Sequence, residues 1–300
     1  MRVWVTGARG MLGQDLVAVL GTAGHEILAT DLEVDVADPE AVARFLETAR
    51  PEVVVNCAAY TRVDDCETEI GAAWAANARA PGVLAEAASR SGARLVHVST
   101  DYVFDGKKPA PQTYAEDDEP SPLSEYGRSK LAGEQAVLAL PGHAVVRTAW
   151  LYGAGGKNFL KTMLNLALSG RELRVVDDQH GSPTWSRSLA RQLEVLCREG
   201  GPGVWHAAGA GSATWYELAS RFLERMEVPL RIIPIPAREY PSPAPRPENA
   251  VLENRRLEAG GLSVFRDWRE DLDEFVRLCG PALLAEAGGG QEARAGLSPL

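Results

Sequence analysis

Short hydrophobic runs alternate with longer amphipathic segments through the first half of this chain. The hydrophobic runs, at residues 2–6, 26–30, 53–57, 95–99 and 144–148, predict buried parallel strands. The segments between them that have helical periodicity are residues 11–20, 40–49, 70–89 and 124–140. Because strands and helices alternate in this order, the pattern predicts right-handed crossovers and an α/β fold with a Rossmann-type, doubly wound parallel sheet.

The regular alternation ends after residue 150. Helices are expected at 158–168, 185–198 and 267–278, a strand at 204–207, and an irregular proline-rich loop at 234–247. We therefore expect a dinucleotide-binding domain formed by residues 1–150 and about 175–207, and a smaller C-terminal substrate-binding lobe formed by about 151–174 and 208–285. Residues 288–300 are rich in glycine and alanine and predict a mobile tail.

Composition narrows the class of protein. A chain of 300 residues with 45% hydrophobic and 24% charged residues suits a soluble globular protein. Its formal charge of −10, with no dense basic run, argues against nucleic acid as the main ligand. The four scattered cysteines lack metal-ligand spacing, and no apolar run is long enough for a membrane span. We therefore expect a cytoplasmic protein with reduced thiols and no membrane partner.

A glycine-rich turn follows the first predicted strand. Gly7, Gly10 and Gly13 have G-x-x-G-x-x-G spacing and open a helix, which is the context of a dinucleotide fingerprint. Glycines permit close approach of the backbone to a pyrophosphate, and the helix N-terminus supplies donors and positive potential. Asp31, at the end of the second strand, can bind an adenine ribose. Asn56, at the end of another strand, is interpreted as a structural hydrogen-bonding residue rather than a catalytic one.

Tyr126 and Lys130 are four residues apart and therefore project from one face of the predicted helix. A nearby ammonium favours tyrosinate, so we expect Lys130 to lower the pKa of Tyr126 and suit it to proton transfer. Taken alone, the pair is a weak signal, because a tyrosine and a lysine often share a helix face. The glycine turn and the longer motifs below favour the catalytic interpretation.

Several longer motifs occur in a fixed order. The chain contains V-N-C-A-A-Y-T-R-V-D at 55–64, S-T-D-Y-V-F-D-G at 99–106, Y-G-R-S-K-L-A-G-E at 126–134 and R-T-A-W-L-Y at 147–152. These are followed by N-F-L-K-T-M-L at 158–164, D-Q-H-G-S-P-T at 178–184 and R-P-E-N at 246–249. Over residues 1 to about 278 the chain closely resembles the dTDP-4-dehydrorhamnose reductases, a family of extended short-chain dehydrogenase/reductases.

The resemblance implies NAD(P)H-dependent reduction of the C4 keto group of dTDP-4-dehydro-β-L-rhamnose to dTDP-L-rhamnose. It makes Tyr126 the proton donor to the C4 oxygen, with Lys130 orienting the nicotinamide ribose and Thr100 as the third catalytic hydroxyl. Positions that match cofactor contacts, besides Gly7, Gly13, Tyr126 and Lys130, are Gly10, Met11, Leu12, Asp31, Asp35, Val36, Ala58, Ala59, Tyr60 and Val98.

For the substrate, the resemblance implies contacts from Thr100, Asp101, Tyr126 and Trp150, with Asp101 binding sugar hydroxyls. Trp150 could instead be a core indole. Arg246 suits a phosphate or a surface salt bridge, and His180 is interpreted as a structural or rim residue. No metal site is assigned, and the oligomeric state is left open, with a homodimer as one option.

Two alternative functions stay open at this point. One is another nucleotide-sugar 4-keto reductase or an epimerase of the same superfamily, because the three catalytic positions specify neither base nor sugar. The other is a regulatory subunit, in which we would expect some of the three catalytic residues to be replaced.

The residues near the glycine turn bear on the choice of cofactor. Asp31 favours NADH, while Arg9 in the glycine turn could neutralise the 2′-phosphate of NADPH, so we expect both cofactors to be used.

Overall fold

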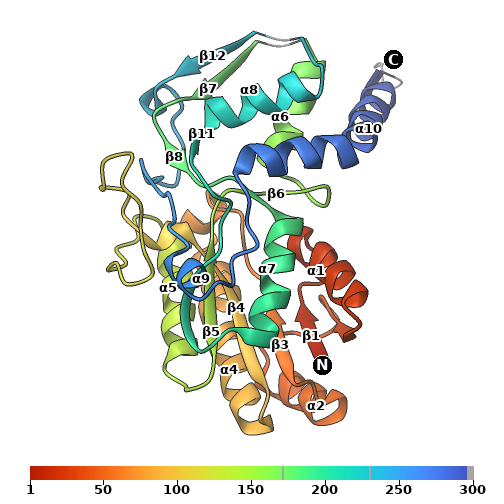
Figure 1. Ribbon diagram of the computed structural model, residues 1–300, viewed down its shortest axis with the longest axis vertical. Coiled ribbons are helices and arrows are strands. Elements are labelled where there is room, and N and C mark those ends of the chain that lie inside the picture. The colour runs from red at the N-terminus through yellow and green to blue at the C-terminus, as the bar shows by residue number, and fades with distance from the viewer. Residues whose placement is uncertain (171, 230, 296–300) are drawn as a thin grey trace.

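The computed structural model describes residues 1–295 except 171 and 230, with side chains through residue 288 (Figure 1). Six parallel strands form the main sheet in the order β10-β5-β4-β3-β1-β2. Their bounds are Arg2–Thr6 for β1, Glu26–Ala29 for β2, Val53–Asn56 for β3, Arg94–Thr100 for β4, Ala144–Thr148 for β5 and Gly203–His206 for β10. The order reverses across β1 and β3, which confirms the predicted doubly wound α/β fold.

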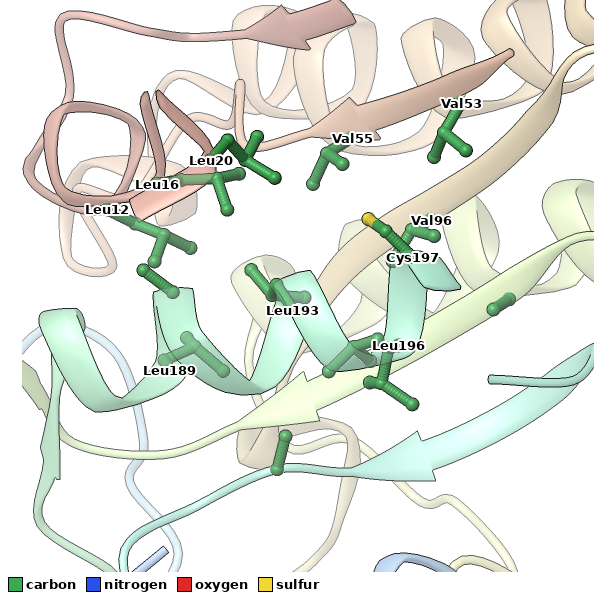
Figure 2. Close-up of a cluster of buried hydrophobic side chains, with 14 of the residues drawn as sticks. Leu12, Leu16, Leu20, Val53, Val55, Val96, Leu189, Leu193, Leu196 and Cys197 are labelled. Atoms are coloured by element: carbon green, nitrogen blue, oxygen red, sulfur yellow. The ribbon is translucent and has the colours of Figure 1, made fainter. Parts of the chain in front are cut away.

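Helices cover both faces of this sheet. On one face lie α1 (Met11–Thr22) and α7 (Ser186–Glu199), whose leucines pack together over valines of the strands (Figure 2). On the other face lie α2 (Pro39–Ala49), α4 (Ala80–Ser91) and α5 (Glu125–Leu138). Their apolar residues bury against the opposite sides of the same strands, because successive strand side chains point to alternate faces.

The helix expected at 70–89 is interrupted. It is divided into α3 (Ile70–Trp74), a π-helical turn η2 (Ala75–Arg79) and α4. Asn77 in the turn is buried; its amide oxygen accepts from the backbone N–H of Tyr60 at 2.8 Å, and its amide nitrogen donates to Ser129 Oγ at 3.2 Å. The wider turn lets this side chain reach both partners, and periodicity alone gave no indication of it.

A second lobe stands over one end of the sheet (Figure 1). It contains α6 (Phe159–Leu168), α8 (Trp215–Arg225) and α10 (Trp268–Ala295), with β7 (Leu173–Val176) paired in parallel to β12 (Ile232–Ile235). These elements share a core of their own, centred on Phe222 and Phe275. Two short strand pairs connect the lobes: β6 (Leu151–Tyr152) with β9 (Thr184–Trp185), and β8 (His180–Gly181) with β11 (Ala213–Thr214).

The chain crosses between the lobes more often than expected. Residues 255–265, which the sequence placed in the second lobe, pack on the sheet: Leu257 of α9 (Arg255–Ala259) belongs to the core shared by α1 and α7. The expected irregular loop at 234–247 begins instead inside β12 and continues through a 3₁₀ turn, η4 (Ala237–Glu239).

The terminal helix is also longer than expected. It was predicted to end at residue 278 but continues to Ala295, so residues 288–295 of the expected tail are helical, and 296–300 lie outside the described residues. Buried Leu283 and the alanine-rich composition account for the extension, since alanine has the highest helix propensity. Among the described helices, this one included, none is long and apolar enough to cross a membrane.

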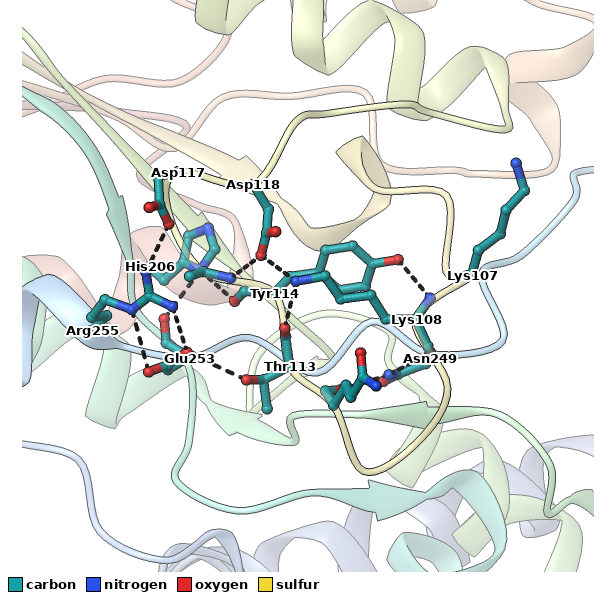
Figure 3. A network of polar contacts seen from close by, with 12 residues as sticks. Lys107, Lys108, Thr113, Tyr114, Asp117, Asp118, His206, Asn249, Glu253 and Arg255 are labelled. Carbon is teal, nitrogen blue, oxygen red and sulfur yellow. Dashed lines mark hydrogen bonds and ion pairs between the residues drawn. The ribbon is translucent and has the colours of Figure 1, made fainter.

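A polar network fastens the long loop that precedes α5 (Figure 3). Lys108 Nζ donates to Asp118 at 2.5 Å, and Asn249 donates to the backbone carbonyl of Lys108 at 3.0 Å. The ring of His206, at the end of β10, lies 3.1 Å from the carbonyl oxygen of Tyr114, and burial lowers its pKa to about 3. A neutral ring therefore donates to that carbonyl and ties the loop to the sheet.

A buried ion pair fixes α5 against β5. Arg147 Nη2 lies 2.7 Å from Glu134 Oε2 and Arg147 Nε lies 3.0 Å from Oε1, with side-chain exposures of 4% and 1%. Two parallel charge-assisted bonds of this kind set both the position and the rotation of the helix. Because α5 also carries Tyr126 and Lys130, the pair positions those side chains as well.

We expect Glu134→Gln to lower the free energy of unfolding by about 3–5 kcal/mol, because it leaves the Arg147 charge buried without a counter-charge. Urea unfolding measures the loss. The matched control, Glu47→Gln on the exposed face of α2, should change stability by less than about 0.5 kcal/mol. Equal stability of the two variants would contradict a positioning role for the pair.

Candidate active site

The carboxyl ends of the parallel strands open into a cavity of about 1110 Å³ between the two lobes. Residues that follow β3, β4 and β5 line one side, and residues of α6, β7 and α8 line the other. Ligands of open α/β sheets bind outside the carboxyl ends of the strands, where the strand order reverses. The cavity therefore lies where the fold predicts a binding site.

The glycine turn approaches its neighbours too closely for side chains. Gly7 has a φ of +63°, and a Cβ atom there would lie 2.7 Å from the backbone nitrogen of Ala58. A Cβ on Gly13 would lie 2.2 Å from the carbonyl oxygen of Gly7. Gly10 forms the N-cap of α1, and within the described residues no side chain caps the first N–H groups of the helix. These free donors and the helix dipole suit an anionic group.

A second, smaller cavity of about 310 Å³ lies beside this turn and is lined by Arg9, Asp31 and Glu33. Asp31 accepts a hydrogen bond from the backbone N–H of Arg9 at 2.9 Å. The Arg9 guanidinium lies 2.8 Å from Glu33 and 3.9 Å from Asp31. Arg9 is thus engaged by two carboxylates, and Glu33 is a partner that the sequence interpretation missed.

The structure brings most of the predicted cofactor positions to the main cavity. Those that line it are Gly10, Met11, Leu12, Gly13, Ala59 and Val98, together with Tyr126 and Lys130. Others lie elsewhere. Asp35 is exposed and accepts from the backbone N–H of Ala37, and Val36 packs against the core beneath β1. Gly7, Ala58 and Tyr60 adjoin the cavity without lining it, and the backbone N–H of Tyr60 is held by Asn77.

Tyr126 lies in the first turn of α5, and its surroundings fix it there. Ser124 caps the helix by accepting from the backbone N–H of Gly127 at 3.2 Å. Gly127 packs so closely that a Cβ atom would lie 2.2 Å from the carbonyl oxygen of Tyr102. This approach brings the Tyr126 ring within 5.4 Å of the Tyr102 ring, edge to face.

The pKa of Tyr126 departs from the expected direction. Burial raises it, the nearby hydroxyl of Thr100 opposes that shift, and the charges of Asp101 and Tyr102 add to it. Burial outweighs any opposing effect of the Lys130 charge, so the predicted lowering of the Tyr126 pKa is not found in this arrangement. The i, i+4 spacing gave the correct helix face, but the lysine side chain is directed to other partners.

Lys130 is buried and contacts the neighbouring strand. Its Nζ donates to the carbonyl oxygen of Val98 at 2.7 Å and lies 3.3 Å from Nε2 of His97. Burial lowers the pKa of Lys130 to about 8, and burial and the Lys130 charge lower that of His97. A lysine in this environment loses its proton readily.

The directions of the hydrogen bonds around His97 also favour a Lys130 amine that loses its proton readily. The amide oxygen of Asn56 accepts from Thr6 Oγ1 at 2.7 Å and from the backbone N–H of Ala58 at 3.1 Å, so its nitrogen faces His97 Nδ1 and donates at 3.0 Å. The hydrogen of a neutral His97 then resides on Nε2, facing Lys130. That contact is a hydrogen bond only when the Lys130 amine is neutral and accepts. Asn56 has the structural role between strands that its sequence position predicted.

Thr100 and Asp101 lie where β4 ends and the short turn η3 (Asp101–Val103) begins. Thr100 Oγ1 donates to Asp101 Oδ1 at 2.9 Å and accepts from the backbone N–H of Tyr102 at 3.2 Å. Asp101 is 2% exposed, and burial raises its pKa to about 7 against the opposing hydrogen bonds from Thr100 and two backbone N–H groups. Its Oδ2 atom has no partner in the described part of the chain.

Aromatic side chains form part of the cavity wall in the second lobe. Trp150 stacks on Trp215 with ring centroids 3.5 Å apart and planes 6° apart, and Phe159 packs against Trp215. Trp150 also has a φ of +44°, a conformation that is rare for a bulky residue and is concentrated at functional sites. Trp150 is therefore a half-buried wall residue that contributes both to packing and to the cavity.

Arg246, the residue considered for phosphate binding, already forms an ion pair within the protein. Arg246 lines the cavity, and both of its terminal nitrogens lie 3.1 Å from the carboxylate of Asp64. His180 pairs with Thr214 in the β8–β11 connection and does not line the cavity. The structure thus places His180 in a structural position, as expected. Arg246 forms an ion pair with Asp64 in the cavity lining, and a phosphate contact from it stays a prediction.

Comparison with known proteins places these features in a family. Residues 1–279 match the model of the RmlD substrate binding domain. A probable dTDP-4,6-dihydroxy-2-methyloxan-3-one 4-ketoreductase of Streptomyces antibioticus is 47% identical over 281 residues, which cover 91% of this chain and 94% of that protein. A dTDP-4-dehydrorhamnose reductase of Mycolicibacterium smegmatis is 45% identical over 281 residues, with coverages of 92% and 85%.

A solved structure agrees with these relatives. The crystal structure of dTDP-4-dehydrorhamnose reductase from Bacillus anthracis in complex with NADP has a TM-score of 0.88 and is 36% identical. The similarity covers 91% of this chain and 98% of that one, so both lobes are shared.

We expect Gly7→Ala to destabilise the protein more than Gly24→Ala, which is its matched control. Both glycines have positive φ values, +63° and +78°, but a Cβ on Gly24 meets nothing within 4 Å. Gly24→Ala should cost about 1–2 kcal/mol for the backbone conformation alone. Gly7→Ala should cost about 1–3 kcal/mol more, because it also overlaps Ala58. Urea unfolding compares the two, and equal losses would contradict the close approach.

Proposed function

The chain belongs to the RmlD substrate-binding-domain family, and we propose that it is an NAD(P)H-dependent reductase that converts dTDP-4-dehydro-β-L-rhamnose into dTDP-L-rhamnose. The observation that carries the proposal is the convergence of Tyr126, Thr100 and Lys130 on the cavity that the glycine turn also lines. In this assignment Tyr126 protonates the C4 oxygen of the sugar, and Thr100 donates a hydrogen bond to the same oxygen. Lys130 contacts the nicotinamide ribose.

The residues present suit a nicotinamide dinucleotide. The unsatisfied N–H groups at the start of α1 would hold the pyrophosphate, and Asp31 would accept from the adenine ribose. When bound, the reduced nicotinamide supplies the hydride for the carbonyl carbon. The protein's own contribution is a buried proton donor at the carbonyl oxygen and a wall formed by Trp150, whose exposed edge would contact the sugar.

A second dTDP-linked keto sugar is the main alternative substrate. The Streptomyces antibioticus relative, at 47% identity, is named as a probable ketoreductase of a different sugar. The catalytic positions would serve either substrate equally, so the distinction must come from other residues of the cavity wall. An epimerase or a regulatory subunit is less favoured, since the three catalytic positions are intact and buried together.

We expect Tyr126→Phe to reduce kcat about 10²–10⁴-fold with dTDP-4-dehydrorhamnose, because only the positioned acid is lost while ring packing stays. Binding of the reduced cofactor, followed by its fluorescence, should be unchanged. The control is Tyr216→Phe on α8, outside the cavity, which should retain parental turnover. Near-parental rates for Tyr126→Phe would show that another group protonates the C4 oxygen.

We also expect NADH and NADPH to support turnover within about tenfold of each other, a difference of 1.4 kcal/mol at most. Glu33 partly neutralises the charge that Arg9 would offer to a 2′-phosphate, so Glu33→Gln should shift the preference towards NADPH by about two- to fivefold, the worth of an exposed ion pair. Initial rates with each cofactor measure this, with Glu86→Gln on α4 as control. A parental preference above a hundredfold would contradict dual use.

A further inference from the structure

The Trp150 indole is held between two protein surfaces, one on each face of its ring. On one face the Trp215 ring lies parallel to it, with centroids 3.5 Å and planes 6° apart. A Cβ atom on Gly181 would lie 2.1 Å from Cε2 of the indole and 2.4 and 2.6 Å from Nε1 and Cζ2. An atom beyond the ring edge would approach Nε1 or Cζ2 more closely than Cε2, so this position lies over the ring face. Because rings 3.5 Å apart leave no room for a backbone between them, Gly181 covers the face opposite Trp215.

The close approach of the indole, and not the backbone conformation, is what requires a glycine at position 181. Gly181 is buried, and its φ lies outside the left-handed region. All three atoms nearest to an added Cβ belong to the Trp150 side chain. The backbone of Gly181 is held in place by its pairing with Ala213 across β8 and β11. An alanine at this position would therefore fit the backbone but would displace the indole.

The same short strand pair positions the residue on the other face. β11 ends at Thr214, and Trp215 is the first residue of α8. Thr214 Oγ1 accepts from the backbone N–H of Glu217 at 3.1 Å, and the Glu217 carboxylate accepts from the backbone N–H of Thr214 at 2.8 Å. This capping box fixes the point at which the helix begins. The antiparallel pair thus carries both covering residues, Gly181 on β8 and Trp215 just after β11.

The backbone of Trp150 is constrained as well, at a point close to the proposed chemistry. Its φ of +44° is a conformation that persists only where the surrounding structure determines it, and its carbonyl oxygen accepts from the backbone N–H of Thr184 at 3.2 Å. Two residues earlier, Thr148 pairs with Thr100 across β5 and β4. Trp150 therefore leaves the sheet beside the strand end that carries Thr100, and both residues line the main cavity.

We propose that Gly181 and Trp215, together the indole clamp, are positioning residues for sugar binding, an inference that rests on the proposed carbonyl reduction. By covering both faces of the Trp150 indole, they leave only its edge for the sugar of a dTDP-linked substrate. Trp150 is then a fixed wall against one side of the sugar and not a platform on which the sugar stacks. A fixed edge restricts where the C4 carbonyl can lie relative to Tyr126, which is how a positioning residue supports the reaction.

A positioning role differs from plain packing in the ligand that it affects. dTDP lacks the sugar, whereas dTDP-L-rhamnose carries it. If the clamp sets the indole edge against the sugar, its loss weakens binding of dTDP-L-rhamnose and leaves binding of dTDP unchanged. If the clamp only packs the second lobe, its loss distorts the cavity and weakens both ligands. Comparison of the two ligands therefore separates the two roles.

The first experiment is calorimetric titration of the full-length protein, saturated with NADPH, with dTDP-L-rhamnose and with dTDP. Gly181→Ala should weaken dTDP-L-rhamnose by about tenfold or more and dTDP by less than about twofold. The matched control is Gly71→Ala on the exposed side of α3, where a Cβ meets nothing within 4 Å, and it should bind both ligands as the parent does. Parental affinity of Gly181→Ala for dTDP-L-rhamnose, or equal losses for the two ligands, would overturn the positioning role.

The second experiment repeats Gly181→Ala in a Trp150→Ala background. An added methyl group that acts through the indole should have no further effect once the indole is gone, so the two changes should be strongly non-additive. The double variant also answers a single variant that folds poorly, because removal of the indole relieves the crowding and should restore the fold. A Gly181→Ala effect of the same size in both backgrounds would overturn the clamp.

The third experiment needs no ligand. Two parallel indoles in contact couple their electronic transitions, so circular dichroism of the ligand-free protein should contain an exciton couplet that Trp215→Leu abolishes. Gly181→Ala should diminish this couplet, because it displaces Trp150 from its parallel position. A couplet of parental size in Gly181→Ala would overturn the clamp, whatever the substrate. A diminished couplet, combined with a parent protein that does not bind dTDP-L-rhamnose, would support the clamp and count against the proposed reaction only.

Discussion

Tyr126, Lys130 and Asp101 are all withdrawn from water, and each therefore loses the solvent that would stabilise its charged form. Burial raises the pKa values of the phenol and the carboxyl and lowers that of the ammonium, which favours the neutral state of all three. Burial thus weakens the charged form of each of the three groups at the cavity. The Lys130 amine contacts Val98 and His97 rather than the Tyr126 phenol.

This chemistry depends on how closely α5 packs on the sheet. The Arg147–Glu134 pair fixes the helix to β5, and Gly127 allows its first turn to contact the backbone of Tyr102. At the other end of the site, the glycine turn lets α1 begin directly against the backbone that follows β3. Both close approaches lie at the carboxyl edge of the sheet, so the same packing that completes the fold also forms the cavity.

The sequence predicted the parts of the structure that depend on local pattern. Apolar runs located the sheet strands to within one or two residues, and the spacing of Tyr126 and Lys130 placed both on one helix face. The sequence pattern could not predict the π-helical turn at Asn77. In that turn the Asn77 side chain forms hydrogen bonds with Tyr60 and Ser129, which are far away in sequence. The direction of Lys130 and the pairing of Arg9 with Glu33 are likewise tertiary contacts. Glu33 could have been noticed as a second carboxylate beside Asp31, whereas nothing local to Lys130 indicates His97.

The most direct test of the account is the fate of the hydride and the product. Incubation of the protein with dTDP-4-dehydrorhamnose and NADPH deuterated at the transferring position of the nicotinamide should oxidise one cofactor for each sugar consumed. We expect dTDP-L-rhamnose that carries deuterium at C4, identified by NMR. Deuterium at another carbon, an epimerised product without net cofactor oxidation, or no reaction with any dTDP-4-keto sugar would contradict the assignment of this cavity as a carbonyl-reducing site.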